Sequence, residues 1–474
     1  MNKINRRTFL GQASCAGLGS LTLMNSLLNL KAITGASISN SSVNNCNDYK
    51  AIVCILKSGG NDSFNMLVPH DSDRYDIYND TRDGIAIPYN DLLPINLAAP
   101  DPMDPSFMYA CHPNMERVRD LFNTKKLSFI SNVGTLTRPN TSKDDFINQV
   151  NLPLKLFSHS DQIQQWQTGL VNERSLKGWG GKIADIINSC NPNQEISMNI
   201  ALNRTNIMQR GNQTVEYVID ADAGSVGVAK HERGSNNFYN QIRTTAVDSL
   251  MCHEYKDIFE KTYADVIKNA IDWNEDFGGA LQNSRTFDAL DFGEGYLGRQ
   301  LRMIARSIDV RQTLGFKRQI FFVEYGGWDH HDTLLRFHPE MLGNVSDAMG
   351  GFMEALEAMQ IENNVLTMTI SEFGRTLTWN GNGSDHAWGG NTMVMGGPNL
   401  INGGRIFGNY PDLSLDSEIE LGGGVIIPSI STDEYFAEVA KWFGVSPGDL
   451  NLIFPNLSEF YATSNSNYPI GFIK

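Results

Sequence analysis

Cysteine is scarce in this chain: only six of its 474 residues are Cys, and none of them has the spacing of a zinc ribbon. Five of the six lie beyond residue 45, so at most two disulfides can form among them and one thiol is left over. Cys54 lies inside the apolar run AIVCIL, where we expect a buried structural thiol.

An excess of basic residues is also missing. The chain has 38 Lys and Arg against 53 Asp and Glu, which gives a net charge of −15 and an isoelectric point near 5.1. Because no basic stretch offsets these carboxylates, we expect no nucleic-acid partner and no anionic membrane partner. No G-x-G-x-x-G follows a strand, which argues against a dinucleotide enzyme. Small molecules and metal cations remain as partners.

The amino-terminal segment lacks an unbroken hydrophobic run. Gln and Asn residues interrupt its weakly apolar stretch, so it would make a poor membrane span. With the pair Arg6-Arg7 ahead of that stretch, residues 1–35 resemble a twin-arginine export signal, cleaved within AITGASIS. We expect a periplasmic or extracellular protein without a stable membrane span after cleavage. A Sec signal and a retained anchor are the alternatives.

The sequence does contain enough apolar residues, 41%, for a sizeable core in one large or two ordinary domains. Short β-branched and aromatic runs alternate with segments of helical period. This order of strand, crossover helix and strand predicts an α/β fold with a mostly parallel sheet and helices on both faces. The predicted strands lie at the start of, or within, residues 51–62, 127–135, 319–329, 364–374 and 391–397.

Two helices and one insertion complete the predicted organisation. A helical stripe, in which apolar residues recur between Met341 and Met359, indicates core packing, and residues 432–444 predict a closing helix. Residues 186–260 are richer in Asn, Gln and Gly and predict an insertion or cap on the main sheet. We therefore prefer one main domain, residues 48–465, with a modest cap.

Acidic residues, histidines and one arginine follow several of the predicted strands. The residues at these positions are Asp62, Asp329, His330, His331, Asp332, Glu372, Arg375, Asp385 and His386. Parallel strands would gather such ends at one crevice, and carboxylates with neutral imidazoles are ligands that Zn²⁺ or Mn²⁺ selects. Taken singly, each has an ordinary alternative as a helix cap, a loop histidine or a plain ion pair.

These residues belong to longer motifs: LKSGGNDSFNMLVP, HPNMERVRDLF, LFSHSDQIQQWQTG, GGWDHHD, SEFGRTLTWNGNGSDHAWGG and GGRIFGNYPDL. Their order resembles the domain of unknown function family 1501, a set of mostly exported bacterial proteins, over nearly all of the mature chain. That family is similar in turn to the alkaline phosphatase and sulfatase superfamily. The resemblance implies a three-layer α/β/α sandwich, two metal sites and a nucleophile at a helix start.

Position by position, the resemblance makes Asp62 the first-strand aspartate, Asp329 and His331 an Asp and His pair, and His386 the last metal histidine. Glu372, with Asp385 beside His386, completes the expected metal ligands. The chain departs from the superfamily where an Asp-His pair is replaced by Glu372-Phe373. One histidine ligand is thus missing, which puts the second metal site in doubt.

The nucleophile is expected in the segment FSHSDQIQQWQTG. Ser158 is the first choice, with Ser160 and His159 behind it, because a helix start offers N–H groups to an anion. Alternatively, Ser158 or Ser160 is only a helix cap. Arg375 is the candidate for holding a non-bridging oxygen of the substrate.

Together these observations predict an exported hydrolase of phosphate or sulfate esters that uses a divalent metal, Zn, Mn or Ca, and takes a small anionic ester as substrate. The rival hypothesis is a non-catalytic binding or assembly protein that keeps the scaffold and one metal. The altered position at Glu372-Phe373 favours the rival, whereas the retained acids and histidines favour an enzyme.

Overall fold

A computed structural model describes residues 46–194, 196–225 and 231–474. The expected export signal, residues 1–35, lies outside these residues. Among the helices that are described, none is long and apolar enough to cross a membrane.

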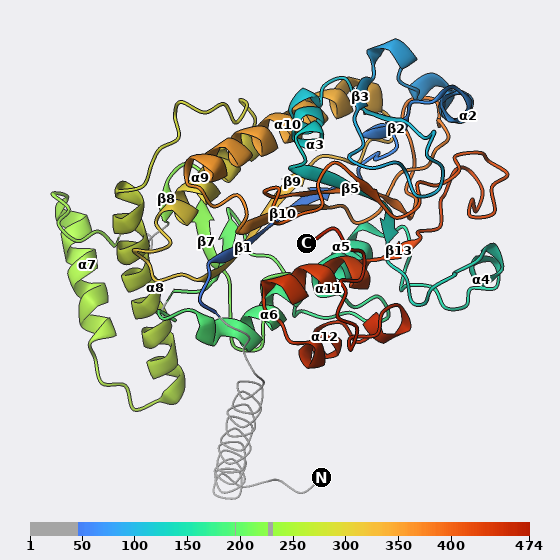
Figure 1. Ribbon diagram of the computed structural model, residues 1–474. Coiled ribbons are helices and arrows are strands. Elements are labelled where there is room, and N and C mark those ends of the chain that lie inside the picture. The colour runs from blue at the N-terminus through green and yellow to red at the C-terminus, as the bar shows by residue number, and fades with distance from the viewer. Residues whose placement is uncertain (1–45, 195, 226–230) are drawn as a thin grey trace, which may run out of the picture.

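A mixed ten-stranded sheet forms the centre of the molecule (Figure 1). Its order is β12-β5-β11-β10-β1-β9-β6-β7-β8, and β13 also pairs with β5. The strands are β1 (Lys50–Ser58), β5 (Leu127–Gly134), β6 (Asn199–Leu202), β7 (Tyr217–Asp220), β8 (Gly224–Ser225), β9 (Arg318–Gly326), β10 (Val365–Ile370), β11 (Gly390–Met395), β12 (Ile406–Phe407) and β13 (Ile430–Ser431).

Most of the strand pairs are parallel. β1 lies between β9 and β10 and is parallel to both, whereas β11 is antiparallel to its neighbours β10 and β5, and β8 is antiparallel to β7. The central strands are buried on both faces and read as apolar runs because helices cover both sides. The predicted α/β sandwich with a mostly parallel sheet is confirmed.

Helices form the two outer layers (Figure 1). One face carries α3 (Glu116–Asn123), α9 (Tyr296–Asp309) and α10 (Leu334–Ala358). The other carries α5 (His159–Thr168), α6 (Trp179–Ile187), α11 (Thr432–Phe443) and α12 (Pro447–Ile453). The predicted helical stripe of α10 and the predicted closing helix α11 both pack into the core. Met349 and Phe352 of α10 are completely buried, and so are Tyr435 and Phe443 of α11.

The segment 186–260, predicted as an insertion or cap, has two parts in the structure. Its first half extends the main sheet, because β6 pairs with β9 and β7 pairs with β6. Its second half begins a helical hairpin, α7 (Phe238–Met251) and α8 (Ile258–Gln282), which projects from the body of the molecule (Figure 1). Helices of the length of α7 and α8 leave a periodic pattern of apolar residues in a sequence. Strands as short as β6 and β7, in a segment rich in Asn, leave little such pattern.

Smaller elements surround this core. A three-stranded antiparallel sheet joins β2 (Leu67–Pro69), β4 (Tyr109–Cys111) and β3 (Leu93–Ile95), with α2 (Ser72–Arg82) beside it and α4 (Lys143–Ile147) further along the chain. A disulfide links Cys46 to Cys190, and Cys54 is a buried thiol as predicted.

The strand register explains where a functional site can form. Ser58 at the end of β1 pairs with Gly326 at the end of β9, and Leu56 of β1 pairs with Ile370, the last residue of β10. The segments that follow these three parallel strands therefore leave the sheet at the same edge.

Candidate metal centre

Asp329 follows β9 at this edge, where the chain after β1 passes very close to it. Gly59 has a φ of +127°, and a Cβ on it would lie 2.4 Å from the backbone nitrogen of Asp329. Only glycine fits both this backbone conformation and this approach. The motif SGGND thus fixes where the Asp329 carboxylate sits.

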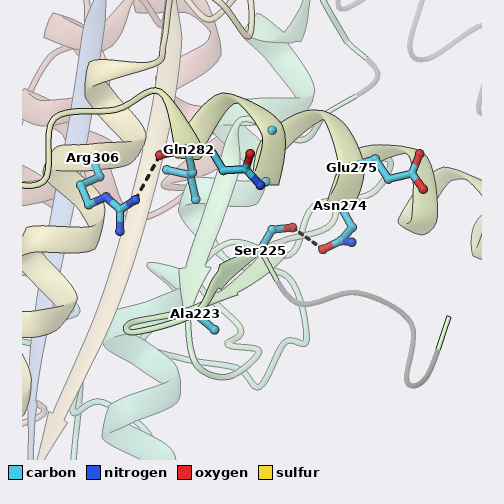
Figure 2. Close-up of a pocket in the computed structure, with 9 residues that line it drawn as sticks. Ala223, Ser225, Asn274, Glu275, Gln282 and Arg306 are labelled. Carbon is cyan, nitrogen blue, oxygen red and sulfur yellow. Dashed lines mark hydrogen bonds between the residues drawn. The ribbon is translucent and has the colours of Figure 1, made fainter. Parts of the chain in front are cut away.

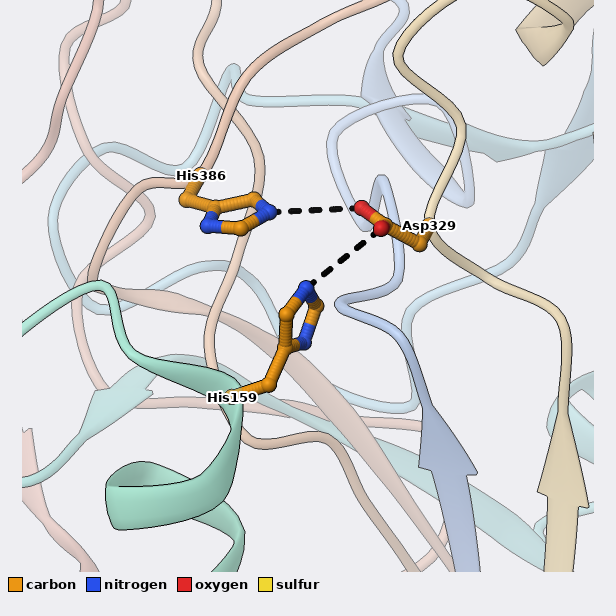
Figure 3. A group of neighbouring side chains, drawn as sticks. All are labelled: His159, Asp329 and His386. Atoms are coloured by element: carbon orange, nitrogen blue, oxygen red, sulfur yellow. Dashed lines mark hydrogen bonds and ion pairs between the residues drawn. The ribbon is translucent and has the colours of Figure 1, made fainter.

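Three histidines surround the Asp329 carboxylate. His386 Nε2 lies 3.3 Å from Oδ1, His331 Nε2 lies 3.1 Å from Oδ1, and His159 Nε2 lies 3.5 Å from Oδ2. Figure 3 shows His159 and His386 turning their rings toward the carboxylate from separate segments of the chain. The candidate ligand atoms of His159, Asp329 and His386 all lie within 4.8 Å of one another.

Each of the three imidazoles is oriented by an acceptor on its other nitrogen. Nδ1 of His159 donates to Glu372 Oε1 at 2.8 Å, Nδ1 of His331 donates to Asp385 Oδ1 at 2.9 Å, and Nδ1 of His386 donates to the carbonyl of Phe157 at 2.9 Å. These acceptors carry no hydrogen, so Nδ1 carries a proton, and in the neutral imidazoles the Nε2 lone pairs face Asp329. Metal-binding histidines have this arrangement.

The resulting centre is short of positive charge. His331 Nε2 and His386 Nε2 lie only 2.9 Å apart, so two lone pairs face each other beside a carboxylate oxygen unless a proton or a cation lies between them. The Nε2 atom of His159 is buried and has no hydrogen-bond partner. Two imidazole nitrogens and one carboxylate, those of His159, His386 and Asp329, could together hold a divalent ion such as Zn²⁺ or Mn²⁺, and His331 lies beside them.

Access to the cluster remains open. The side chains of His159, Asp329, His331 and His386 are between 22% and 47% exposed. A structural zinc site is closed, whereas a catalytic site leaves room for water or substrate. A molecule from solvent can reach the side chains of this cluster.

Arg375 holds the Asp329 carboxylate. Its guanidinium pairs with Oδ1 and also donates to the carbonyls of Gly60 and Ser384, each at 2.9 Å, and of Gly59 at 2.7 Å. Arg375 is completely buried. The guanidinium of Arg375 therefore donates to acceptors within the protein. In this structure it positions Asp329, and it does not reach the surface where it could bind a substrate oxygen.

The charges around the cluster shift its pKa values in opposite directions. Burial alone would raise the pKa of Asp329, but the hydrogen bond and charge of Arg375 outweigh it and lower that pKa. The hydrogen bond to Glu372 raises the pKa of His159. Burial lowers the pKa of His386, which keeps its Nε2 lone pair available.

Glu372 and Asp385, the other two expected metal ligands, hydrogen-bond to imidazoles of the cluster. Glu372 is completely buried, and its Oε1 accepts hydrogen bonds from His159 and from the backbone N–H of Gly59, the latter at 2.7 Å. Asp385 orients His331. Both carboxylates therefore act behind the imidazoles.

Phe373 lies where the superfamily has a histidine. Its ring centroid is 4.6 Å from that of His386 and 4.9 Å from that of His159. An apolar ring on this side offers no metal ligand.

Asp62 does not join the cluster. It is completely buried and forms an ion pair with Arg82 of α2, whose guanidinium also donates to the carbonyl of Thr376 at 3.2 Å. Sequence reasoning missed Arg82, which lies twenty residues further along the chain in a helix of weak apolar pattern. A buried arginine cannot be recognised from such a pattern alone.

Ser158 precedes α5 as its N-cap residue, yet its hydroxyl does not cap the helix. The Oγ atom donates instead to Asp161 Oδ2 at 2.9 Å, and Asp161 is paired with Arg174 at 2.6 Å. Ser160 Oγ lies 3.3 Å from Ser158 Oγ. Its neighbour His159, also a candidate nucleophile, is one of the three histidines around Asp329.

A separate cavity of about 480 Å³ lies between α8 and β8, bounded by Ser225, Asn274, Glu275, Gln282 and Arg306. Figure 2 shows that Ser225 and Asn274 hydrogen-bond to each other across it. None of the cluster residues lines this cavity. The histidine cluster is therefore the site with the clearer chemistry.

Comparison with known proteins decides the family. Residues 49–420 match the model of the family described as Protein of unknown function (DUF1501). The chain belongs to this family. The match contains every residue of the cluster and the segments that orient it. No curated protein matches the chain.

Several solved structures are similar at low identity. The structure of Ps i-CgsB in complex with k-i-k-neocarrahexaose is 11% identical in sequence, with a TM-score of 0.33. The alignment covers 87% of this chain and 77% of the Ps i-CgsB chain. The C-terminal periplasmic domain of EcEptC from Escherichia coli, in complex with Zn, is 10% identical, with coverages of 84% and 83% and a TM-score of 0.32. The activity of this DUF1501 protein must be argued from its own residues.

Proposed function

We propose that this protein is an exported metal-dependent hydrolase of phosphate or sulfate esters, with one divalent ion held by His159, Asp329, His331 and His386. The observation that carries the proposal is the pair of Nε2 atoms, 2.9 Å apart, directed at one carboxylate. Such an arrangement is unfavourable unless a proton or a metal ion lies between the lone pairs, and a metal ion would also be bound by the carboxylate.

The side chains of the cluster bind and orient. Three imidazoles favour Zn²⁺ or Mn²⁺ over Ca²⁺, which prefers oxygen ligands alone. A divalent ion held there would supply Lewis-acid polarisation of an ester oxygen. Glu372, Asp385 and the Phe157 carbonyl keep the imidazoles in the binding tautomer, and Arg375 keeps Asp329 in place.

Ser158 remains our candidate nucleophile. It adjoins His159 at the start of α5, and its hydroxyl already donates to a carboxylate, Asp161. A carboxylate in hydrogen-bond contact can accept the proton when a hydroxyl attacks an ester. The backbone N–H groups at the start of α5 are oriented to stabilise an anionic substrate group.

One observation favours the rival function, a metal-binding protein without catalysis. The guanidinium of Arg375 is fully engaged by protein acceptors, so it is not available to hold a substrate oxygen. A binding or assembly protein needs only the ion and an exposed site.

The first experiment measures metal. The purified protein, dialysed against chelator and reloaded, should bind one Zn²⁺ or Mn²⁺ per chain by inductively coupled plasma mass spectrometry. His386→Ala should lower the affinity at least 10- to 100-fold, since even indirect partners of metal ligands have effects of this size. His253→Ala, at an exposed histidine outside the cluster, serves as the control. Failure of the wild type to bind any divalent ion would remove both functions.

The second experiment separates binding from catalysis. Ser158→Ala should retain the metal and lose the hydrolysis of aryl phosphate or aryl sulfate esters, because the hydroxyl forms the covalent intermediate. Ser142→Ala, at a serine that does cap its helix, is the matched control. A wild type that carries one metal per chain but hydrolyses no ester in the panel supports the binding protein instead.

The export route has its own test. Changing Arg6 and Arg7 together to Lys should leave the precursor in the cytoplasm, because the arginine pair is the signal that the export receptor reads. Cell fractionation measures this. Normal export of the double variant would point to the Sec route.

A further inference from the structure

The chain between β5 and α5 leaves the body of the molecule and carries the short helix α4. Figure 1 shows α4 at the edge of the structure, on a loop that extends away from the sheet. At the base of this loop, Oγ1 of Thr137 donates a hydrogen bond to the carbonyl of Asn151, so the two ends lie side by side. Compact surface loops with adjacent ends, called Ω-loops, are frequently functional.

The α4 loop, residues 138–153, has no polar contact with the body of the protein. Ser142 and Asp145 form a capping box at the start of α4, and Arg138 pairs with Asp145. Within the part of the chain that the structure describes, every hydrogen bond and ion pair of this loop ends at another residue of the segment 137–153. The loop can therefore leave its place without breaking a polar contact with the body.

Apolar contacts hold the α4 loop in place. Its Phe146 and Leu152 pack against a small hydrophobic cluster, separate from the main core, whose buried members are Leu136, Trp388 and Ile427. The ring centroid of Phe146 also lies 6.2 Å from that of Phe157. Because so few side chains take part, we expect the loop to open at a much lower cost in free energy than global unfolding.

The same contacts lead to the candidate metal centre. The carbonyl of Phe157 accepts the hydrogen bond that orients His386, at 2.9 Å, and Trp388 follows His386 by two residues. Phe157 has a φ of +69°, which an L side chain rarely adopts and which the surroundings must hold. The ring of Phe146 is part of those surroundings. The position of the α4 loop is thus linked to the orientation of His386.

Left-handed backbone conformations are concentrated in and beside the α4 loop. Eleven of the described residues other than glycine have a positive φ, and five of them lie here: Asn140, Gln149, Asn151, Lys155 and Phe157. Such conformations cost free energy that tertiary contacts must offset. Because these residues can relax when the loop opens, the docked and undocked forms differ less in free energy than the apolar contacts alone suggest.

We propose that the α4 loop is a gate that undocks from its hydrophobic cluster, turns the Phe157 carbonyl away from His386, and so lets a metal ion enter or leave. Docked, the loop keeps His386 in the orientation that binds the ion, and the ion in turn favours the docked form. The link to the ion rests on the proposed function, whereas the undocking does not.

Hydrogen exchange of the metal-free full chain tests the undocking. A helix as short as α4 is not stable by itself, so the backbone N–H groups of residues 146–150 should exchange when the loop undocks, and faster than those of β1. Phe146→Ala should speed this exchange about tenfold, because it removes much of the apolar contact. Ile147→Ala, at a neighbouring side chain that is 72% exposed, is the matched control and should exchange like the wild type.

Zn²⁺ tests the gate. Saturation with Zn²⁺ should slow the exchange of residues 146–150 in the wild type, since an ion that binds only the docked form stabilises it. Phe146→Ala should release Zn²⁺ to a chelator about tenfold faster than Ile147→Ala, in proportion to the more frequent opening of the loop. Unchanged exchange of the β1 amides in both variants shows that the fold is retained.

The possible results separate the loop from the metal site. Exchange of residues 146–150 as slow as that of β1, or equal exchange in the two variants, overturns the undocking. Zn²⁺ that binds but does not slow this exchange, or that leaves both variants at the same rate, overturns the gate and leaves the metal site in place. A wild type that binds neither Zn²⁺ nor Mn²⁺ overturns the gate together with the proposed function.

Discussion

Asp329 and Asp62 follow neighbouring parallel strands, yet they serve different purposes. Asp329 is about half exposed and faces three imidazoles, with Arg375 behind it. Asp62 is completely buried and faces one arginine, Arg82. A sheet edge thus provides two kinds of place for a carboxylate, one open to a ligand and one closed by the protein.

The difference lies in what neutralises the charge. Arg82 neutralises Asp62 permanently, because a guanidinium does not lose its proton in proteins. Asp329 is also paired with a buried arginine, Arg375, but it faces three imidazoles as well. These imidazoles can be neutral, so they can accept a proton or bind a metal ion. We therefore propose the open carboxylate among histidines as a binding site, whereas the closed carboxylate that faces only an arginine is a structural contact.

The largest effect is expected when this comparison is broken at Asp62. Asp62→Leu leaves Arg82 buried without its carboxylate and should lower the free energy of unfolding by about 3–5 kcal/mol. Asp329→Asn retains an oxygen for Arg375 and should cost far less, while abolishing metal binding. Denaturant titration of the metal-free variants compares the two.

A double variant tests the reason given for that loss. Asp62→Leu with Arg82→Met replaces both charges and should recover most of the stability, since a buried pair can often be exchanged for apolar residues. If Asp329→Asn proved as destabilising as Asp62→Leu, the contrast between an open and a closed carboxylate would be wrong.

Sequence reasoning brought Asp329, His331 and His386 to one edge of the sheet, as the structure does, but it did not give the hydrogen bonds among them. The apolar runs of β1, β9 and β10 predicted the sheet edge, and His386 indeed lies 3.3 Å from Asp329. The roles of Glu372 and His159 could not be predicted, because either side chain can be a ligand or its partner. Their roles depend on the loop before α5, where Phe157 has a φ of +69° and turns its carbonyl toward His386.

A smaller effect, on metal affinity, is expected from changes to Glu372 and Asp385, the carboxylates that accept hydrogen bonds from the imidazoles. Glu372→Gln weakens the acceptor that orients His159 and should lower metal affinity about 10- to 100-fold. Asp385→Asn should have less effect, because its carboxylate is 57% exposed and water can replace it. Isothermal titration with Zn²⁺ measures both, with the exposed Glu418→Gln as the control. Equal affinities for Glu372→Gln and Glu418→Gln would deny Glu372 its orienting role.

A third carboxylate, Asp433 in the first turn of α11, has neither kind of neutralising partner. It is completely buried, and neither oxygen has a hydrogen-bond partner. Burial raises its pKa from 3.8 to about 8, so the protein holds this group in its neutral, protonated form. It completes the comparison: a buried carboxylate with no arginine, imidazole or metal keeps its own proton.

Asp433 should therefore make the stability of the protein depend on pH. Because its folded pKa lies above its unfolded value, its contribution is present in full below about pH 4 and is lost as the pH rises toward 8. Asp433→Asn is neutral throughout, so its free energy of unfolding relative to the wild type should rise between pH 5 and pH 8 by at least about 1.4 kcal/mol, the equivalent of one pKa unit. Denaturant titrations at the two pH values measure the difference. Asp73→Asn, at an exposed aspartate in the first turn of α2, should show no such rise. An unchanged difference for Asp433→Asn would mean that the carboxylate is ionised in the folded protein and has found a positive partner.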